Sequence, residues 1–132
     1  MREILFRGKR IDNGEWVYGQ YAYLLNARTE DGEPIKHMIV DGTPFGQTVD
    51  PSTVGQYTGL TDKNGKKIFE GDVMEFDAYG FHYKGVVSFA DGNFGVMCNR
   101  PTASPFLDNA IEQHDAIFVG NIHDNPELLE GD

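Results

Sequence analysis

Short runs of β-branched and aromatic residues alternate along the chain with glycine, proline and Asp-Gly or Asn-Gly pairs. The arrangement is densest where the strand-like segments Gln56–Leu60 and Lys67–Phe69 flank the polar run Asp62–Gly65. Aspartate favours the start of a turn, and an Asn-Gly pair tolerates the left-handed backbone that a tight hairpin needs. The pattern therefore predicts a hairpin here, and a further strand that begins after Gly71, where the missing Cβ permits a sharp change of direction.

Turn signals of the same kind predict two more hairpins. The first joins a strand that begins near Glu3 to the aromatic run Trp16–Leu24 through the turn Asp12–Gly14. The second joins the strand Gly85–Phe89 to an alternating segment that follows Asp91-Gly92. Further strands are expected at two segments rich in β-branched or aromatic residues, Ile35–Val40 and Ala116–Ile122.

The remaining segments carry no clear strand period. An exposed loop or hairpin tip is predicted over Asn26–Pro34, and loops are predicted over Asp77–Tyr83 and Asn99–Pro105. Leu107–His114 fits either a short helix or a strand. At the end of the chain, Asn125 is a suitable cap, Pro126 suits a first helical position and Glu127 is an acid in the first turn, so a short C-terminal helix is predicted.

The length and the composition limit the possible number of domains and the fold class. A length of 132 residues is close to the usual ~100–150 residues of one domain, so a single domain over residues 1–132 is expected. The 16 glycines, nine phenylalanines and six tyrosines favour many short strands. We therefore predict a mainly β fold, with a small SH3-like, barrel-like core of short antiparallel strands and a short C-terminal helix.

The net charge of -10 opposes general binding to nucleic acid or to an anionic membrane. Four of the eleven basic residues lie within the first ten positions, and none follows Arg100. These opposite ends can attract each other within one subunit or between subunits, or the acidic surface can simply keep the protein soluble.

The N-terminal segment is too polar for the apolar part of a signal peptide, and no stretch is long and apolar enough to span a membrane. A cytoplasmic protein is therefore expected. The single cysteine, Cys98, excludes an internal disulfide framework and is expected to be a buried thiol.

Two dipeptides, His114-Asp115 and His123-Asp124, repeat nine residues apart and resemble metal ligands of phosphohydrolases. A predicted strand separates them, whereas such ligands normally lie on helices, so surface or strand-end positions are expected. Asp72 can act as an acid or base, or it can bond backbone amides where the turn enters the strand, as we expect. The chain carries none of the usual enzyme signature spacings, so we predict no catalytic residue, no cofactor and no metal.

Two groups of aromatic residues are candidate contact surfaces. Tyr79, Phe81 and Tyr83 beside Lys84 can stack single-stranded bases, but the acidic charge favours self-association or partner contact instead. In the other group, large side chains occupy both faces of one predicted strand, so an interface in a homo-oligomer is predicted at Trp16, Tyr18, Tyr21 and Tyr23.

Specific motifs extend over nearly the whole chain: Phe6-Arg7-Gly8-Lys9, Trp16-Val17-Tyr18-Gly19, Val54–Leu60, Ile68-Phe69-Glu70-Gly71-Asp72 and Val119–Ile122 followed by Asp124–Leu128. On these motifs the chain resembles the YopX family of bacteriophage and prophage proteins. The resemblance implies a phage protein without an established activity, with no catalytic residues to transfer, and suggests that subunits assemble. Residues that it marks as structural turn or motif positions are Gly59, Asp62, Gly65, Glu70, Gly71, Asp72, Gly120, Asn121, Asn125 and Pro126.

Three hypotheses for function follow. The first is a non-enzymatic interaction or self-assembling module that binds a host or phage protein in the host cytoplasm. The second is an acidic nucleic-acid mimic that blocks a host DNA-binding protein. The third is a metal-dependent hydrolase that uses the His-Asp pairs.

Overall fold

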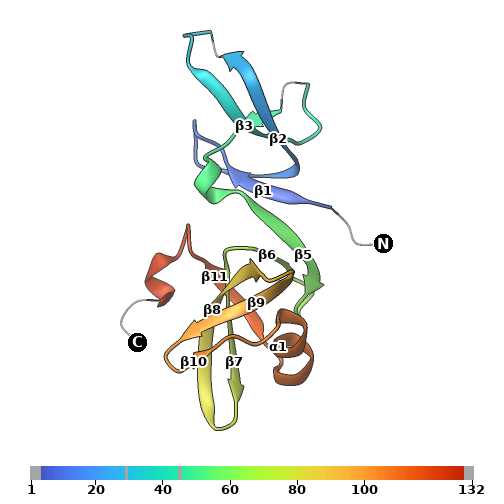
Figure 1. Ribbon diagram of the computed structural model, residues 1–132, viewed down its shortest axis with the longest axis vertical. Helices are drawn as coiled ribbons and strands as arrows, with labels where there is room; N and C mark the ends of the chain where they lie inside the picture. Colours follow the sequence, from blue (N-terminus) through green and yellow to red (C-terminus); the bar gives the residue numbers. More distant parts are fainter. Residues whose placement is uncertain (1–3, 29, 45, 130–132) are drawn as a thin grey trace. The chain divides into compact units, whose positions relative to one another are not determined.

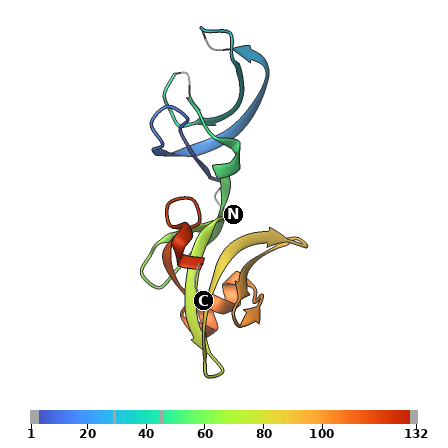
Figure 2. The same cartoon turned by 90° about the vertical axis from the view of Figure 1, so that its left-hand side faces the viewer.

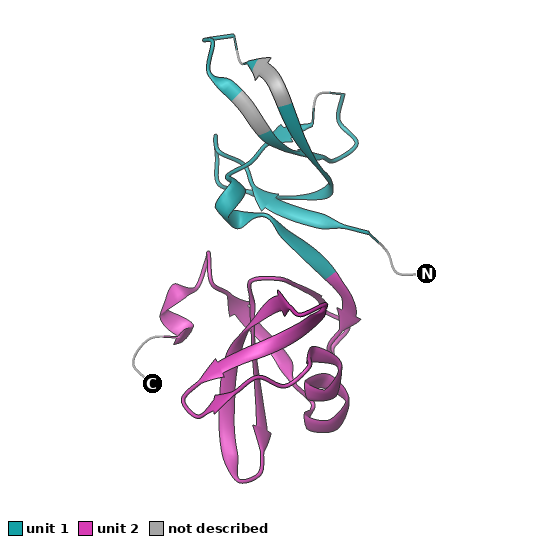
Figure 3. Cartoon of the chain, viewed as in Figure 1, with its two compact units in different colours: residues 1–57 teal, residues 58–132 magenta. Residues whose placement is uncertain are grey.

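A computed structural model describes residues 4–28, 30–44 and 46–129. Its backbone contacts divide the chain into two compact units, residues 1–57 and residues 58–132 (Figure 3). We call them the first and the second unit and describe each by itself. The expected single domain over residues 1–132 stays a prediction.

The first unit is an antiparallel sheet with the strand order β4-β3-β2-β1-β5 (Figure 1). Its elements are β1 (Phe6–Lys9), β2 (Trp16–Arg28), β3 (Pro34–Val40), β4 (Gln47–Thr48), the 3-10 helix η1 (Pro51–Thr53) and the start of β5 (Gly55–Thr61). A Cβ on Gly19 would lie 2.0 Å from the backbone oxygen of Val40, so β2 can meet β3 here only without a side chain. Ile39 and Val49 are buried.

Of the loop or hairpin tip predicted over Asn26–Pro34, the structure shows a hairpin tip, shorter than expected, between β2 and β3. After an irregularity between Tyr23 and Ala27, β2 continues to Arg28, which pairs with Pro34 at the start of β3. The prediction was wrong for the ends of this segment because strand pairing depends on the backbone, and polar side chains do not prevent it.

The second unit contains the continuation of β5, paired with β6 (Lys67–Phe69), and a second antiparallel sheet with the strand order β10-β9-β8-β7-β11 (Figures 1 and 2). The elements of that sheet and its surroundings are β7 (Asp72–Ala78), β8 (Phe81–Ala90), β9 (Asn93–Asn99), β10 (Thr102–Ala103), α1 (Leu107–His114), β11 (Ile117–Asn121) and the 3-10 helix η2 (Pro126–Leu129). The hairpin predicted at Asp62–Gly65 is therefore the β5–β6 connection. Gly71 enters β7 with a φ of 90°, a conformation that suits glycine.

One face of the second sheet carries the core of this unit. Met74, Phe76 and Ala78 alternate along β7, and they share a buried cluster with Leu107 and Ala110 of α1. The three- and four-residue spacing of Leu107, Ala110 and Ile111 places them on one side of a helix. Leu107–His114, which the sequence left open between a short helix and a strand, is therefore a helix.

The segment Asp77–Tyr83 is not the predicted loop. Tyr79 and Gly80 form a tight two-residue turn with φ values of 53° and 82°, and β7 and β8 pair on both sides of it. β11 pairs with β7 only as far as Glu75, and β9 reaches β8 only at Gly85. Residues 76–84 therefore project as a two-stranded hairpin, which we call the distal ribbon (Figures 1 and 2).

The mainly β fold with a short helix, predicted from the sequence, is confirmed. The α-helix itself is α1, whereas the segment after Asn125 forms the 3-10 helix η2.

Candidate functional site

Two neighbouring hollows of the second unit adjoin the distal ribbon. The polar hollow, of about 450 Å³, is lined by Lys63, Glu75, Phe76, Asp77, His82, Gln113, His114, Asp115 and Ile117. The aromatic hollow, of about 230 Å³, is lined by Phe76, Ala78, Tyr79, Tyr83, Ala103, Pro105, Asn109, Gln113 and His114. Both therefore share a wall made of Phe76, Gln113 and His114.

The register of the ribbon assembles the charged part of the polar hollow. Asp77 pairs with His82 across the strands, and Glu75 lies two residues before Asp77 on the same face of β7. The His82 Nδ1 lies 2.7 Å from Asp77 Oδ1, and its Nε2 lies 3.4 Å from Glu75 Oε2. The hydrogen bond to Asp77, aided by both carboxylate charges, raises the pKa of His82, so the imidazolium persists to a higher pH than usual.

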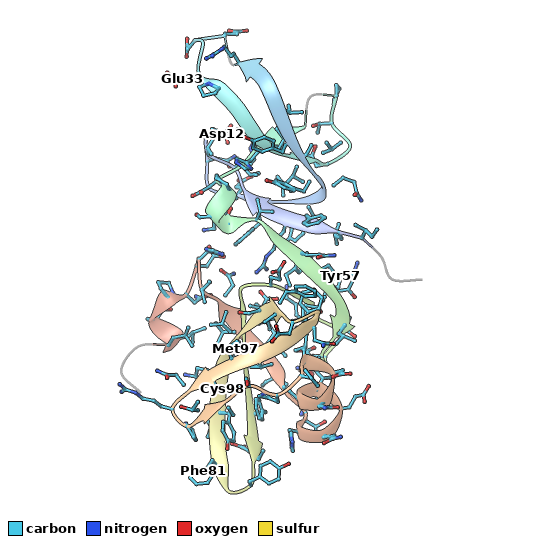
Figure 4. The ribbon with its side chains drawn as sticks, in the orientation of Figure 1. Asp12, Glu33, Tyr57, Phe81, Met97 and Cys98 are labelled. Atoms are coloured by element: carbon cyan, nitrogen blue, oxygen red, sulfur yellow. The ribbon has the colours of Figure 1, made fainter. Side chains whose placement is uncertain are left out.

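Stacked rings form the shared wall and the aromatic hollow. The Phe76 ring stacks on Tyr83 at a centroid distance of 5.2 Å and on His114 at 5.8 Å. Tyr79 meets the His114 ring edge-on at 5.5 Å, although its side chain is 83% exposed. Phe81, at the end of the ribbon, is 58% exposed (Figure 4). Aromatic surface is thus presented to solvent beside a hollow.

The two His-Asp pairs have different surroundings. His114 and Asp115 line the polar hollow, whereas Asp124 lies in the turn after β11, where it accepts a hydrogen bond from Asn121 Nδ2 at 3.0 Å. Within the described residues, no group of three or more His, Cys, Asp or Glu side chains is arranged to hold a metal ion. The metal-dependent hydrolase stays a hypothesis.

A family model described as YopX protein matches residues 5–130. The chain belongs to the YopX family. A solved structure, that of protein EF1440 from Enterococcus faecalis, is similar to this chain with 27% sequence identity and a TM-score of 0.55, over 98% of this chain and 100% of that one. No curated protein matches the chain. None of the helices in the described ranges is long and apolar enough to cross a membrane.

The motif residue Asp62 joins distant parts of the second unit in this YopX-family chain. Its buried carboxylate accepts backbone hydrogen bonds from Asn64 at 2.9 Å, from Lys66 at 3.0 Å and, on β11, from Phe118 at 3.1 Å. Burial acts to raise the pKa of Asp62, but these amides, with the Lys66 charge, outweigh it and lower the pKa. Asp62 thus fixes the β5–β6 turn against β11.

Other motif residues also organise backbone. The buried Asp72 accepts a hydrogen bond from the Phe69 amide at 2.7 Å. Asn121 Oδ1 accepts from the amides of His123 and Asp124, and a Cβ on Gly120 would lie 2.7 Å from Asn125 Oδ1. Of the remaining motif residues, Gly59 lies in β5 and Gly65 in the β5–β6 turn. Glu70 and Gly71 lie at the entry to β7, and Pro126 begins η2.

The four aromatic residues predicted to form an interface differ in their surroundings. The Trp16 ring lies 4.5 Å from the Arg7 guanidinium and 5.5 Å from Lys9 Nζ. Tyr21 is half-buried and its hydroxyl bonds His37, whereas Tyr18 and Tyr23 are 44% and 52% exposed. Only Tyr18 and Tyr23 thus offer extensive surface to a partner.

Sequence reasoning missed the trio Glu75, Asp77 and His82. Part of the signal was present, because Gly80 lies between two segments in which apolar and polar residues alternate. Once the turn at Tyr79-Gly80 is recognised, the strand register places His82 opposite Asp77.

Replacing Asp62 by Asn should lower the free energy of unfolding at neutral pH by about 1.5–3 kcal/mol, because three amides lose a charged acceptor. A lowered folded-state pKa contributes stability above the unfolded pKa of about 4 and loses it as pH falls through the folded value. The difference between wild type and Asp62→Asn should therefore shrink below about pH 4. Urea unfolding at several pH values measures it, with the exposed Asp91→Asn as control. A difference that is independent of pH would contradict this role.

Proposed function

We propose that this chain is a phage- or prophage-encoded, non-enzymatic protein-interaction module that acts in the cytoplasm of a bacterial host. The observation that carries the proposal is the distal ribbon, which exposes Tyr79 and Phe81 beside the aromatic hollow. Rigid aromatic side chains next to a preformed hollow are typical of the residues that contribute most to protein interfaces.

The ribbon is suited to contact because its backbone is fixed. Its strands pair continuously from Val73-Val86 to Ala78-Phe81, and the Phe76–Tyr83 stack holds its inner face. A partner that binds Tyr79 and Phe81 therefore does not have to order a flexible loop, which would otherwise reduce the binding free energy.

The cysteine supports a non-enzymatic assignment. Cys98 is buried, and burial raises the pKa of its thiol to about 11. A thiol in this state is almost fully protonated near neutral pH and is a poor nucleophile.

We also propose that copies of the chain associate through β2. Tyr18 and Tyr23 are exposed on that strand, and exposed aromatic residues favour contact with another surface.

Affinity capture from host cells should enrich a protein that the wild type and Phe89→Ser retain and Phe81→Ser loses. Phe81 and Phe89 are both exposed on β8, at 58% and 52%, but only Phe81 belongs to the distal ribbon. Quantitative mass spectrometry compares the three captures. Equal recovery of the protein by both variants would contradict the proposal that the distal ribbon is the binding surface. If added DNA released the captured protein, the result would favour the hypothesis of an acidic nucleic-acid mimic.

Light scattering at micromolar concentration should report a mass above the 14.8 kDa of one chain. Replacing both Tyr18 and Tyr23 by Ser should shift the mass towards that value, because it removes the exposed aromatic surface of β2. Phe89→Ser is the control for a general loss of exposed aromatic surface. A single-chain mass for the wild type at every concentration would exclude this association.

A further inference from the structure

The polar and the aromatic hollow have different chemistry and a common wall. Asp77, Asp115 and His82 belong to the polar hollow alone, and Tyr79 and Tyr83 to the aromatic hollow alone. The rings of Phe76 and His114 line both. A ligand that fills the two hollows together therefore presents a charged group next to an apolar group.

The polar hollow lies within the range of roughly 300–1,000 Å³ that is usual for ligand sites. Among its carboxylates, Glu75 lies 3.4 Å from His82 Nε2 and is opposite Lys84 across the strands. Asp77 has a side chain that is 83% exposed, and Asp115 is exposed at the end of α1. Both carboxylates face solvent, although Asp77 also binds His82 at 2.7 Å, and the net charge of -10 attracts a cation to them.

We infer that the paired hollows bind a segment of a partner protein in which a basic side chain and an apolar side chain are neighbours. The ammonium or guanidinium group lies in the polar hollow beside Asp77 and Asp115. The apolar side chain packs on the rings of Tyr79 and Tyr83 in the aromatic hollow. This inference rests on the proposed function and specifies the chemistry of the partner.

Histidine protonation makes this recognition dependent on pH. The His82 ring binds the Asp77 carboxylate most strongly when the ring is an imidazolium, and it then competes with a cationic ligand for that carboxylate. Because the pKa of His82 is raised, this competition extends towards neutral pH. His114 also lines this hollow. The other charged groups that face His82 or line the hollow are Glu75, Asp77, Lys84, Lys63 and Asp115. Binding should therefore tighten as pH rises from about 6 to about 8.

The test uses the full chain and a short acetylated peptide, Gly-Arg-Leu-Gly amide, titrated while the NMR signals of the His82 and His114 rings are followed. Asp115→Asn should weaken binding about threefold to tenfold. Asp91→Asn is the matched control, because Asp91 and Asp115 are both exposed and both have a φ of 53°, which Asn also tolerates. The two variants have the same net charge.

Replacing arginine in the peptide by the uncharged citrulline, or leucine by serine, should each weaken binding by a similar factor. The inference is overturned if Asp91→Asn and Asp115→Asn weaken binding equally, which would indicate general attraction to an acidic surface. It is also overturned if the citrulline peptide binds as well as the arginine peptide, or if no peptide binds. In that last case, selective loss of a captured protein by Phe81→Ser would still support the proposed function.

Discussion

The register of β7 against β8 is the constraint on which the candidate site depends. It places His82 opposite Asp77 and Tyr83 opposite Phe76, so one face of the ribbon becomes charged and the other aromatic. A shift by one residue would exchange the two faces. It would turn His82 towards the core and remove the stack between Phe76 and Tyr83. The tight turn at Tyr79-Gly80 helps to fix this register, since a two-residue loop permits few alternatives.

The residues that carry the family motifs have a different part in the structure. Asp62, Asp72 and Asn121 are buried, and their side-chain oxygens accept hydrogen bonds from backbone amides. These contacts connect the β5–β6 turn, the entry to β7 and the turn after β11. These three motif residues therefore organise the backbone of the second unit, while the residues that line the polar hollow lie mainly on the distal ribbon and at the end of α1.

Local turn chemistry explains which elements the sequence could predict. Asp91-Gly92 and Asn64-Gly65 carry their own conformational preference, so both hairpins were predicted correctly. Tyr79 was missed because tyrosine rarely has a positive φ, and only the pairing of the flanking strands imposes it. The helical state of Leu107–His114 depends on the sheet that buries Leu107 and Ala110. The hollows depend on that same packing, so the sequence alone could not reveal them.

We propose that partners bind this protein at the distal ribbon and the adjoining hollows. Backbone NMR shifts of the intact chain, recorded before and after addition of the captured partner, locate the binding surface. The largest changes are expected within residues 76–84 and 113–115. Changes confined to β2 around Tyr18 and Tyr23, with residues 76–84 unaffected, would contradict it.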